Sequence, residues 1–189
     1  NLKEISNETE YIIITSKDFE SHAYQISDLH SSKDNLVCEV VVVDNIYNEF
    51  SSGMQDVTAI RDFLKMLYDR ADSQLKYVLL FGDGSYDPKN RISNNTNFIP
   101  TYQSFNSTSP TSTYVTDDYF GLLDDSEGLF VNDLIDIGIG RFPVSTQEEA
   151  ETLVDKVEYY YSQFSFGPWR NDIVFIADDG DANDQNIIK

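Results

Sequence analysis

The feature that most constrains the fold is a series of short, continuously apolar runs separated by stretches with helical periodicity. The runs occupy residues 11–15, 38–44, 77–81 and 134–142. Strands that are apolar on both faces are typical of a parallel sheet that helices cover on each side. The sequence therefore predicts an α/β fold built on a parallel sheet.

The segments between the apolar runs predict helices. Residues 17–29 are polar and amphipathic, and residues 56–68 carry apolar side chains three or four positions apart behind Asp56, a suitable N-cap. Ser145 and Thr146 provide a start signal for a further helix that extends to about residue 164. Each of the first two apolar runs thus begins a βα unit.

Three segments depart from this alternation. Residues 88–113 are rich in Asn, Ser, Thr and Pro, which predicts a long surface loop. Residues 114–131 contain two short apolar runs around an acidic turn, which predicts a hairpin at the sheet edge. Residues 172–181 repeat the pattern of an apolar strand that ends in acids. We therefore expect one α/β subdomain over residues 1–170, and the first strand and loop of a second subdomain over residues 171–189.

Net charge limits the partners. The 189 residues include 33 acidic and 13 basic side chains, for a formal net charge of -20. Such a field repels phosphate backbones, so we expect no nucleic-acid partner. Cations or basic peptides are more suitable partners, although many acidic proteins are simply soluble. No apolar run approaches the roughly twenty residues of a membrane-spanning helix, so none is predicted.

A complete nucleophilic device is not recognisable in the chain. The one cysteine, Cys38, lies in an apolar run without a basic neighbour, where a thiol is usually a small buried hydrophobe. The two histidines, His22 and His30, both fall on the first predicted helix, away from the carboxyl ends of the strands. Core packing for Cys38 and surface or partly buried positions for both histidines are the favoured interpretations.

Acidic and polar residues gather where apolar runs end. Carboxylates at alternate positions in a tight loop suit a calcium ion, which takes several oxygen ligands. Asp and Asn also cap helices and form turns, which explains most such residues in soluble proteins. Both interpretations remain open for the following residues: Asp83, Ser85, Asp87, Asp117, Asp118, Asp124, Asp125, Asp136, Asp178, Asp179, Asp181 and Asn183.

Five motifs in fixed order resemble the gingipain-type (C25) cysteine peptidases, and within that family most closely the sortases of the type IX secretion system. The motifs lie at residues 77–87, 99–104, 116–124, 136–143 and 176–181. The resemblance implies a flavodoxin-like, three-layer parallel sheet that forms the first subdomain of a caspase-like fold. It places the catalytic Cys and His in a second subdomain beyond Lys189, which leaves this segment without them.

The resemblance also implies roles for particular acids. The positions that correspond to the calcium ligands of gingipains are Asp83, Asp87 and Asp136. Asp179 is nearest to the acid that orients the catalytic histidine of gingipains. Calcium is thus the expected cofactor, in a structural role.

The sortases of this family cut C-terminal sorting domains from secreted cargo and attach the cargo to surface lipopolysaccharide. The resemblance therefore implies an exported protein at the outer membrane or cell surface of a Gram-negative bacterium. Its expected partners are its own catalytic subdomain, cargo with sorting domains and other secretion components. One alternative is a noncatalytic, calcium-dependent binding module of the same fold. A phosphoacceptor receiver is disfavoured, because no acid pair follows the run at residues 11–15.

Overall fold

The protein is built around a four-stranded parallel sheet. The computed structural model describes residues 1–105, 108–109, 113–128 and 133–175. Its sheet has the strand order β2-β1-β3-β6. Tyr11 pairs with Cys38 on one side and with Tyr77 on the other, and Tyr77 pairs with Gly138. The predicted parallel α/β fold is confirmed. The strands are β1 (Tyr11–Thr15), β2 (Cys38–Val42), β3 (Tyr77–Phe81) and β6 (Gly138–Phe142).

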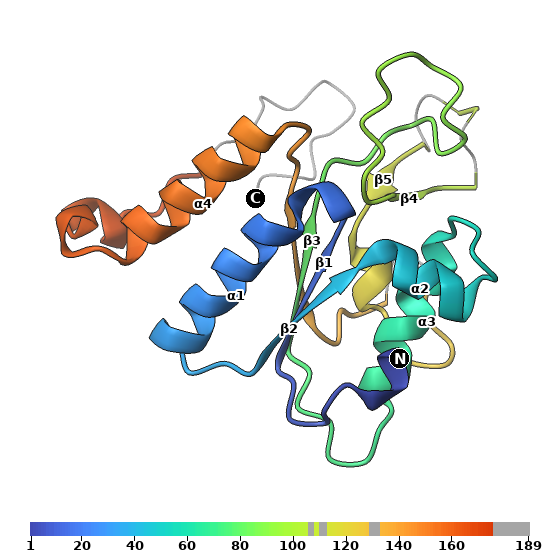
Figure 1. Cartoon of the computed structure of the whole chain (residues 1–189), viewed down its shortest axis with the longest axis horizontal. Coiled ribbons are helices and arrows are strands. Elements are labelled where there is room, and N and C mark those ends of the chain that lie inside the picture. The colour runs from blue at the N-terminus through green and yellow to red at the C-terminus, as the bar shows by residue number, and fades with distance from the viewer. Residues whose placement is uncertain (106–107, 110–112, 129–132, 176–189) are drawn as a thin grey trace, which may run out of the picture.

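Helices cover both faces of this sheet, which gives three layers. The helices α1 (Glu20–Lys33) and α4 (Gln147–Tyr161) lie on one face, and α2 (Val43–Phe50) and α3 (Val57–Tyr68) lie on the other (Figure 1). Side chains alternate along each strand between two apolar cores. On β1, for example, Ile12 and Ile14 face the α2/α3 core while Ile13 faces the α1/α4 core.

The helix starts follow the sequence signals. The Asp56 carboxylate accepts a hydrogen bond from Thr58 N at 2.8 Å, as expected of an N-cap. Thr146 and Glu149 form a reciprocal capping box at the start of α4. The first predicted helix begins with the 3-10 turn η2 (Lys17–Phe19) and continues as α1 to Lys33.

Two predicted strands are too long. The run at residues 38–44 ends as a strand at Val42, and α2 begins at Val43 because Val43, Ile46 and Tyr47 bury one helical stripe. Because the residues are apolar throughout, the sequence does not show where the strand period of two gives way to the helix period of 3.6. The run at residues 134–142 forms a strand only from Gly138, and Leu134 is 79% exposed.

The predicted hairpin at residues 114–131 is wrong in its first arm. Val115–Thr116 (β5) pairs with Tyr102–Gln103 (β4) in a separate antiparallel ribbon, and Asp118–Gly121 forms the 3-10 turn η3. The long loop 88–113 therefore contains a strand of its own. The second predicted arm, residues 129–131, lies outside the described residues. In Figure 1 the ribbon lies beyond the carboxyl ends of β1 and β3.

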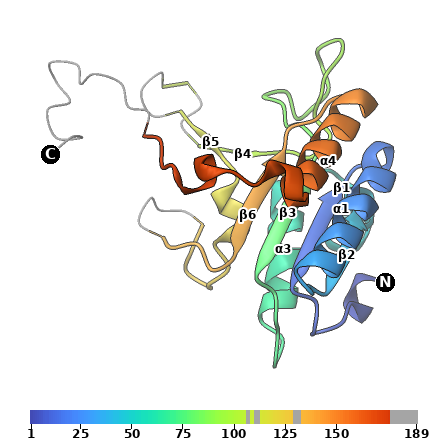
Figure 2. The ribbon, with the colours of Figure 1, turned by 90° about the vertical axis from the view of Figure 1, so that its left-hand side faces the viewer.

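The segment after α4 crosses the β6 side of the sheet. It contains η4 (Gln163–Ser165) and η5 (Pro168–Asn171), and the chain then passes the β6 edge (Figure 2). Residues 172–175 form no strand, although residues 172–181 were predicted to begin with one, and the remainder of that prediction lies outside the described residues. A further 3-10 turn, η1 (Leu2–Glu4), opens the chain. Within the described ranges, no helix is long and apolar enough to cross a membrane.

Candidate functional site

The loop after β3 leaves the carboxyl edge of the sheet through a backbone conformation that requires glycine. Gly82 has φ of +148°, and a Cβ there would lie 2.9 Å from Phe98 Cβ. The returning chain binds this loop, since Phe98 N and Ile99 N both donate to Asp83 O at 3.0 Å. The segment around Phe98 and Ile99 therefore covers the carboxyl edge beside β3.

Asp83 lies at this edge and joins two loops. Its Oδ2 accepts a hydrogen bond from Thr96 Oγ1 at 2.6 Å and from Ser145 Oγ at 3.4 Å. Ser145 follows β6, so the contact bridges the ends of β3 and β6. A carboxylate that is shared between two hydroxyl groups in this way is a structural acceptor.

Asp87 is the most buried acid among the described residues, at 2% exposed. Its carboxylate accepts hydrogen bonds from Ile92 N at 2.8 Å and from Arg91 N, and Arg91 Nε lies 3.3 Å away. Burial opposes the charged form, but the two backbone N–H groups and the guanidinium outweigh it and hold the pKa of Asp87 below its usual range. Asp87 thus organises the turn that follows it.

A mostly buried arginine fixes the rest of this edge. The Arg141 side chain is 13% exposed and pairs with Asp117 through two hydrogen bonds of 2.7 Å. The same guanidinium donates to Gly82 O at 2.7 Å, Ile99 O at 2.8 Å and Pro100 O at 3.2 Å. A planar fork of five donors suits this arrangement, which a lysine could not reproduce.

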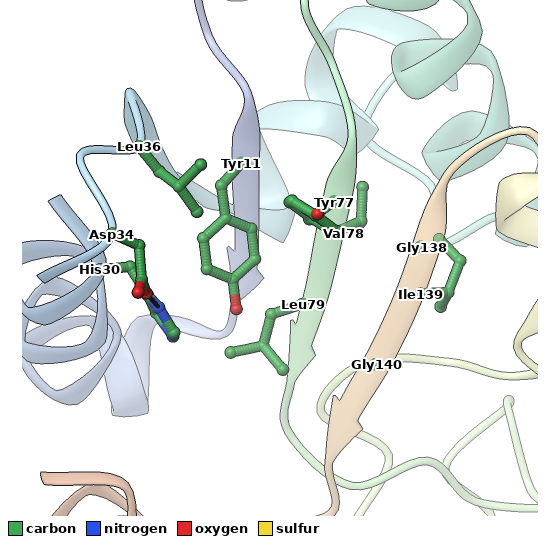
Figure 3. A pocket seen from close by; sticks show the side chains of 10 residues that line it. All are labelled: Tyr11, His30, Asp34, Leu36, Tyr77, Val78, Leu79, Gly138, Ile139 and Gly140. Atoms are coloured by element: carbon green, nitrogen blue, oxygen red, sulfur yellow. Dashed lines mark hydrogen bonds and ion pairs between the residues drawn. The ribbon is translucent and has the colours of Figure 1, made fainter. Parts of the chain in front are cut away.

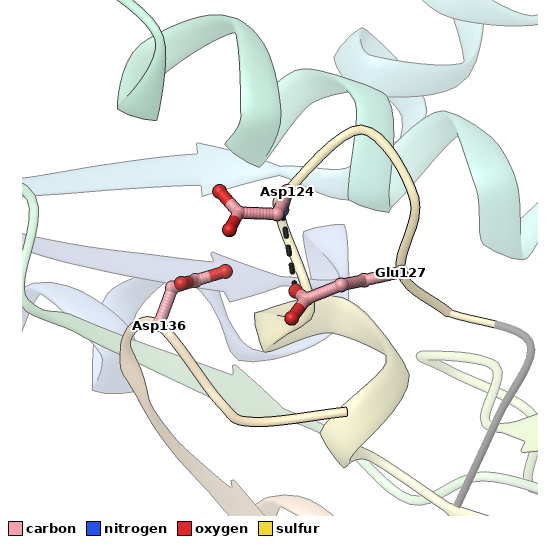
Figure 4. A group of neighbouring side chains, drawn as sticks. All are labelled: Asp124, Glu127 and Asp136. Carbon is pink, nitrogen blue, oxygen red and sulfur yellow. Dashed lines mark hydrogen bonds between the residues drawn. The ribbon is translucent and has the colours of Figure 1, made fainter. Parts of the chain in front are cut away.

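Asp136 lies at the opposite end of the sheet. It precedes β6, and because the strands are parallel this is the amino edge, whereas Asp83 and Asp87 follow β3 at the carboxyl edge. One ion therefore cannot bind all three predicted ligands. Asp136 instead approaches Asp124 and Glu127, and one carboxylate oxygen from each lies within 4.8 Å of the others. Figure 4 shows the three carboxylates around a common space.

The donors around this acidic cluster leave oxygens available to a cation. Asp136 Oδ2 accepts from Leu123 N at 2.7 Å, Asp136 Oδ1 accepts from the Tyr68 hydroxyl at 3.5 Å, and Glu127 Oε2 accepts from Asp124 N at 3.3 Å. Within the described ranges, none of the three acids forms an ion pair with a basic side chain. Three hard oxygen ligands fit calcium in kind, although calcium usually takes six to eight. Sequence reasoning singled out Asp124 and Asp136 but missed Glu127, which had only its place in the acidic turn as a signal.

Two basic side chains of α3 order the loop that carries this cluster. Arg61 donates from Nε to Leu122 O at 2.6 Å and from Nη2 to the backbone oxygens of Asp124 and Glu127 at 3.2 Å. Lys65 donates to Leu123 O at 2.7 Å and pairs with Asp125. These contacts with α3 hold the loop that carries the cluster in place.

Cys38 is half-buried, not fully buried as predicted. Burial raises the pKa of the Cys38 thiol, which opposes formation of the reactive thiolate. No hydrogen bond joins Cys38 to His22 or His30 in the part of the chain that the structure describes. His30 instead contacts Asp34 Oδ2 at 2.6 Å. Asp179, the predicted orienting acid, lies outside the described residues.

The amino half of the sheet also borders an open cavity of about 560 Å³. It lies between the end of α1 and the amino half of β6, where Gly138 and Gly140 present no side chains (Figure 3). His30 and Asp34 form one wall, and Asp34 also accepts a hydrogen bond from Tyr161 of α4 at 2.6 Å. These contacts join α1 to α4 at the cavity's edge.

Comparison with known proteins assigns the family. The model of peptidase family C25 matches residues 4–189. The chain belongs to peptidase family C25. Its fold resembles that of dimeric latent PorU from Porphyromonas gingivalis, with 35% identity, a TM-score of 0.72 and coverage of 86% of this chain but 16% of PorU. No curated protein matches the chain.

Gingipains share the fold at lower identity. The Arg-specific cysteine proteinase gingipain R is 24% identical, with a TM-score of 0.58 and coverage of 84% of this chain and 30% of that one. A complex of the RgpB pro- and mature domains from Porphyromonas gingivalis gives 24% identity, a TM-score of 0.57 and coverage of 80% and 29%. The C25 chain thus spans less than a third of each of these proteins. The predicted membership of the gingipain-type (C25) family, with a resemblance to PorU, is confirmed.

Proposed function

We propose that this chain is the N-terminal α/β subdomain of a C25 cysteine peptidase of the PorU type. In this proposal it is a scaffold, and the catalytic Cys and His are supplied by a second subdomain further along the same polypeptide. The 35% identity to PorU over 86% of the chain, with a TM-score of 0.72, is the observation that carries the proposal. The raised pKa of the Cys38 thiol supports a catalytic nucleophile elsewhere.

The reaction proposed for the parent protein is that of a sortase. It would cleave the C-terminal sorting domain from secreted cargo through an acyl-enzyme on the catalytic cysteine, and attach the cargo to lipopolysaccharide. The protein would act at the outer membrane or cell surface, with cargo and other components of the type IX secretion system as partners. The resemblance to PorU supports this assignment of substrate class.

The surface beside β6 suits contact with the rest of the parent protein. Large apolar side chains are exposed there, including Phe164 at 77%, Phe166 at 69% and Trp169 at 52%. Ile173, Val174 and Phe175 follow directly and are 78–89% exposed. Exposed apolar surface of this extent usually marks an interface. We assign it to the second subdomain, because the chain leaves the sheet at this place.

Calcium is the ion that we propose for the acidic cluster of Asp124, Glu127 and Asp136. The ion would neutralise three converging carboxylates and stabilise the loop before β6. Asp83 and Asp87 could ligate an ion only at a separate site on the carboxyl edge. Their present hydrogen bonds to protein donors make them the weaker part of the predicted set.

Activity of the parent protein and its variants tests the proposal. The parent should cleave a substrate that carries a C-terminal sorting domain, residues 1–189 alone should not, and Cys38→Ser in the parent should leave the rate unchanged. Cleavage by residues 1–189 alone would contradict the scaffold role. A parent sequence without a downstream Gly-His-Gly motif and cysteine would favour the alternative, a noncatalytic calcium-dependent binding module.

A further inference from the structure

The open cavity of about 560 Å³ beside the amino half of β6 has a single formal charge on its walls. That charge belongs to Asp34, and no lysine or arginine lines the cavity. An anion would meet this carboxylate in a protein whose net charge is -20, so the cavity suits a cation. We name it the amino-edge pocket, and its principal walls are Tyr11, His30, Asp34, Tyr77, Gly138 and Gly140 (Figure 3).

The carboxylate of Asp34 has one oxygen that is bound by protein donors and one that is not. Its Oδ2 accepts hydrogen bonds from the Tyr161 hydroxyl and from His30 Nδ1, each at 2.6 Å. These two bonds, the one from Tyr161 first, hold the pKa of Asp34 below its usual range. Oδ1 has no partner in the described part of the chain, and the side chain is 35% exposed. Asp34 therefore presents an ionised, accessible oxygen to the pocket.

His30 and Tyr11 add two further hydrogen-bonding atoms. A carboxylate only accepts, so His30 Nδ1 carries a proton toward Asp34, and Nε2 of the neutral ring is an acceptor. Within the described ranges, neither His30 Nε2 nor the Tyr11 hydroxyl has a hydrogen-bond partner. Neither atom belongs to the buried, unpartnered side-chain atoms of these ranges, so both are accessible. The pocket thus has acceptors that a ligand can reach.

The floor of the pocket leaves room for a second backbone. A Cβ on Gly140 would lie 4.0 Å from its nearest neighbour, Leu79 Cδ1, so the space above this residue is open. Glycine within a strand often marks a place where another backbone approaches closely. The pocket can therefore take a side chain together with the adjoining backbone of an extended segment.

A guanidinium group matches these walls better than a metal ion does. Calcium takes six to eight oxygen ligands, whereas the pocket offers one carboxylate. A guanidinium is planar, has five donors for a carboxylate and neighbouring acceptors, and stacks on aromatic rings. The rings of Tyr11 and Tyr77 lie 6.3 Å apart, and Tyr77 is 47% exposed, so an aromatic surface lies beside the acceptors.

We propose that the amino-edge pocket binds an arginine side chain on an extended segment of a partner protein. The guanidinium pairs with Asp34 Oδ1 and donates to His30 Nε2, and the backbone of the segment crosses β6 at Gly140. The pocket lies at the amino half of the sheet, whereas ligands of open α/β sheets usually collect beyond the carboxyl ends of the strands. The inferred role is therefore docking, and it is independent of the proposed peptidase function.

Titration of ¹⁵N-labelled residues 1–189 with the peptide acetyl-Gly-Arg-Gly-amide tests the proposal. The peptide should shift the backbone amide resonances of Gly138 and Gly140 in a saturable way. The matched peptide with citrulline in place of arginine has nearly the same shape but no charge. It should bind at least about tenfold more weakly, because it cannot pair with the carboxylate of Asp34.

Two variants locate the contact on the protein. Asp34→Asn removes the charge but keeps an acceptor for Tyr161, and it should weaken binding of the arginine peptide about tenfold. Its control, Asp28→Asn, makes the same change of charge at an exposed position of α1 and should leave the affinity unchanged. Gly140→Val places a side chain in the pocket and should abolish binding, and valine suits a strand.

Backbone amide spectra show whether each variant is folded, and Gly140→Val with the citrulline peptide decides the matter if Asp34→Asn is not. The proposal is overturned if the arginine peptide causes no saturable shift or if the citrulline peptide binds as tightly. Equal weakening by Asp34→Asn and Asp28→Asn would also overturn it, because binding would then depend only on the net charge of the protein.

Discussion

Both edges of the sheet carry clustered carboxylates, but the carboxylates at the two edges differ in how many protein donors they bind. At the carboxyl edge, Asp83 and Asp87 are bound by hydroxyl and backbone donors of the following loop, and Asp117 is paired with Arg141. At the amino edge, three carboxylates converge, and no basic side chain pairs with them within the described ranges. The carboxylates of the carboxyl edge are thus paired with donors of the protein, whereas those of the amino edge have oxygens that a cation could bind.

The difference shows that an acid's neighbours decide its role more than its place in a motif. The loop after β3 has alternate acids and resembles a calcium loop in sequence, but its own chain supplies the donors. The acidic turn before β6 lacks that spacing, yet it brings Asp124 and Glu127 to Asp136. The two loops differ in the burial of their acids and in whether their carboxylates converge, and both properties depend on the fold.

The largest expected effect is the loss of the arginine that holds the carboxyl edge. Arg141→Ala leaves Asp117 and three backbone carbonyls without their donor, so we expect about 3–5 kcal/mol lower stability in urea unfolding. Arg91→Ala, whose side chain is 74% exposed, should cost no more than about 0.5 kcal/mol. Equal losses of stability in the two variants would show that the hydrogen bonds of Arg141 do not stabilise the carboxyl edge.

A smaller loss is expected from Gly82→Ala. The φ of +148° and the 2.9 Å approach of a Cβ to Phe98 Cβ should together cost about 2 kcal/mol or more. Gly140→Ala is the control, because a Cβ there lies 4.0 Å from its nearest neighbour, Leu79 Cδ1. Urea midpoints compare the two. If Gly140→Ala is the more destabilising, the described path of the loop after β3 is wrong.

Calcium should distinguish the edges directly. If the acidic cluster binds calcium, a concentration one hundred times the dissociation constant adds about 2.7 kcal/mol, visible as a higher thermal midpoint than with chelator. Asp136→Asn should remove most of this shift, and Asp83→Asn should retain it. A midpoint that calcium leaves unchanged would count against the proposed ion. A shift lost in Asp83→Asn alone would move the ion to the carboxyl edge.

The smallest effect concerns acid unfolding. The pKa of Asp87 is lower in the fold than the ordinary value of an aspartic acid, so its contribution to stability is present above that ordinary value and is lost as pH falls through the lower, folded pKa. Asp87→Asn should therefore flatten the fall in stability below about pH 4. Arg91→Ala should keep most of this slope, since the backbone N–H groups of Arg91 and Ile92 remain. An unchanged slope in Asp87→Asn would contradict this role.

Hydrophobic periodicity in the sequence predicted the sheet and most of the helices, but it could not predict which acidic residues meet in the fold. Residues 11–15 and 77–81 were predicted as strands because both of their faces are buried. Period alone could not separate α2 from the end of β2, since Val42 and Val43 are both apolar. The meeting of Asp136 with Glu127 depends on η3 and on Arg61 and Lys65, which are remote in sequence from β6.

The central claim is the proposal that the catalytic nucleophile of the parent protein lies outside residues 1–189. The most direct measurement treats the active parent protein with a peptide-based, cysteine-directed acyloxymethyl ketone and identifies the labelled residue by mass spectrometry. The account predicts labelling of a cysteine beyond residue 189, with Cys38 unlabelled and inhibition unaffected by Cys38→Ser. Stoichiometric labelling of Cys38 together with loss of activity would contradict it.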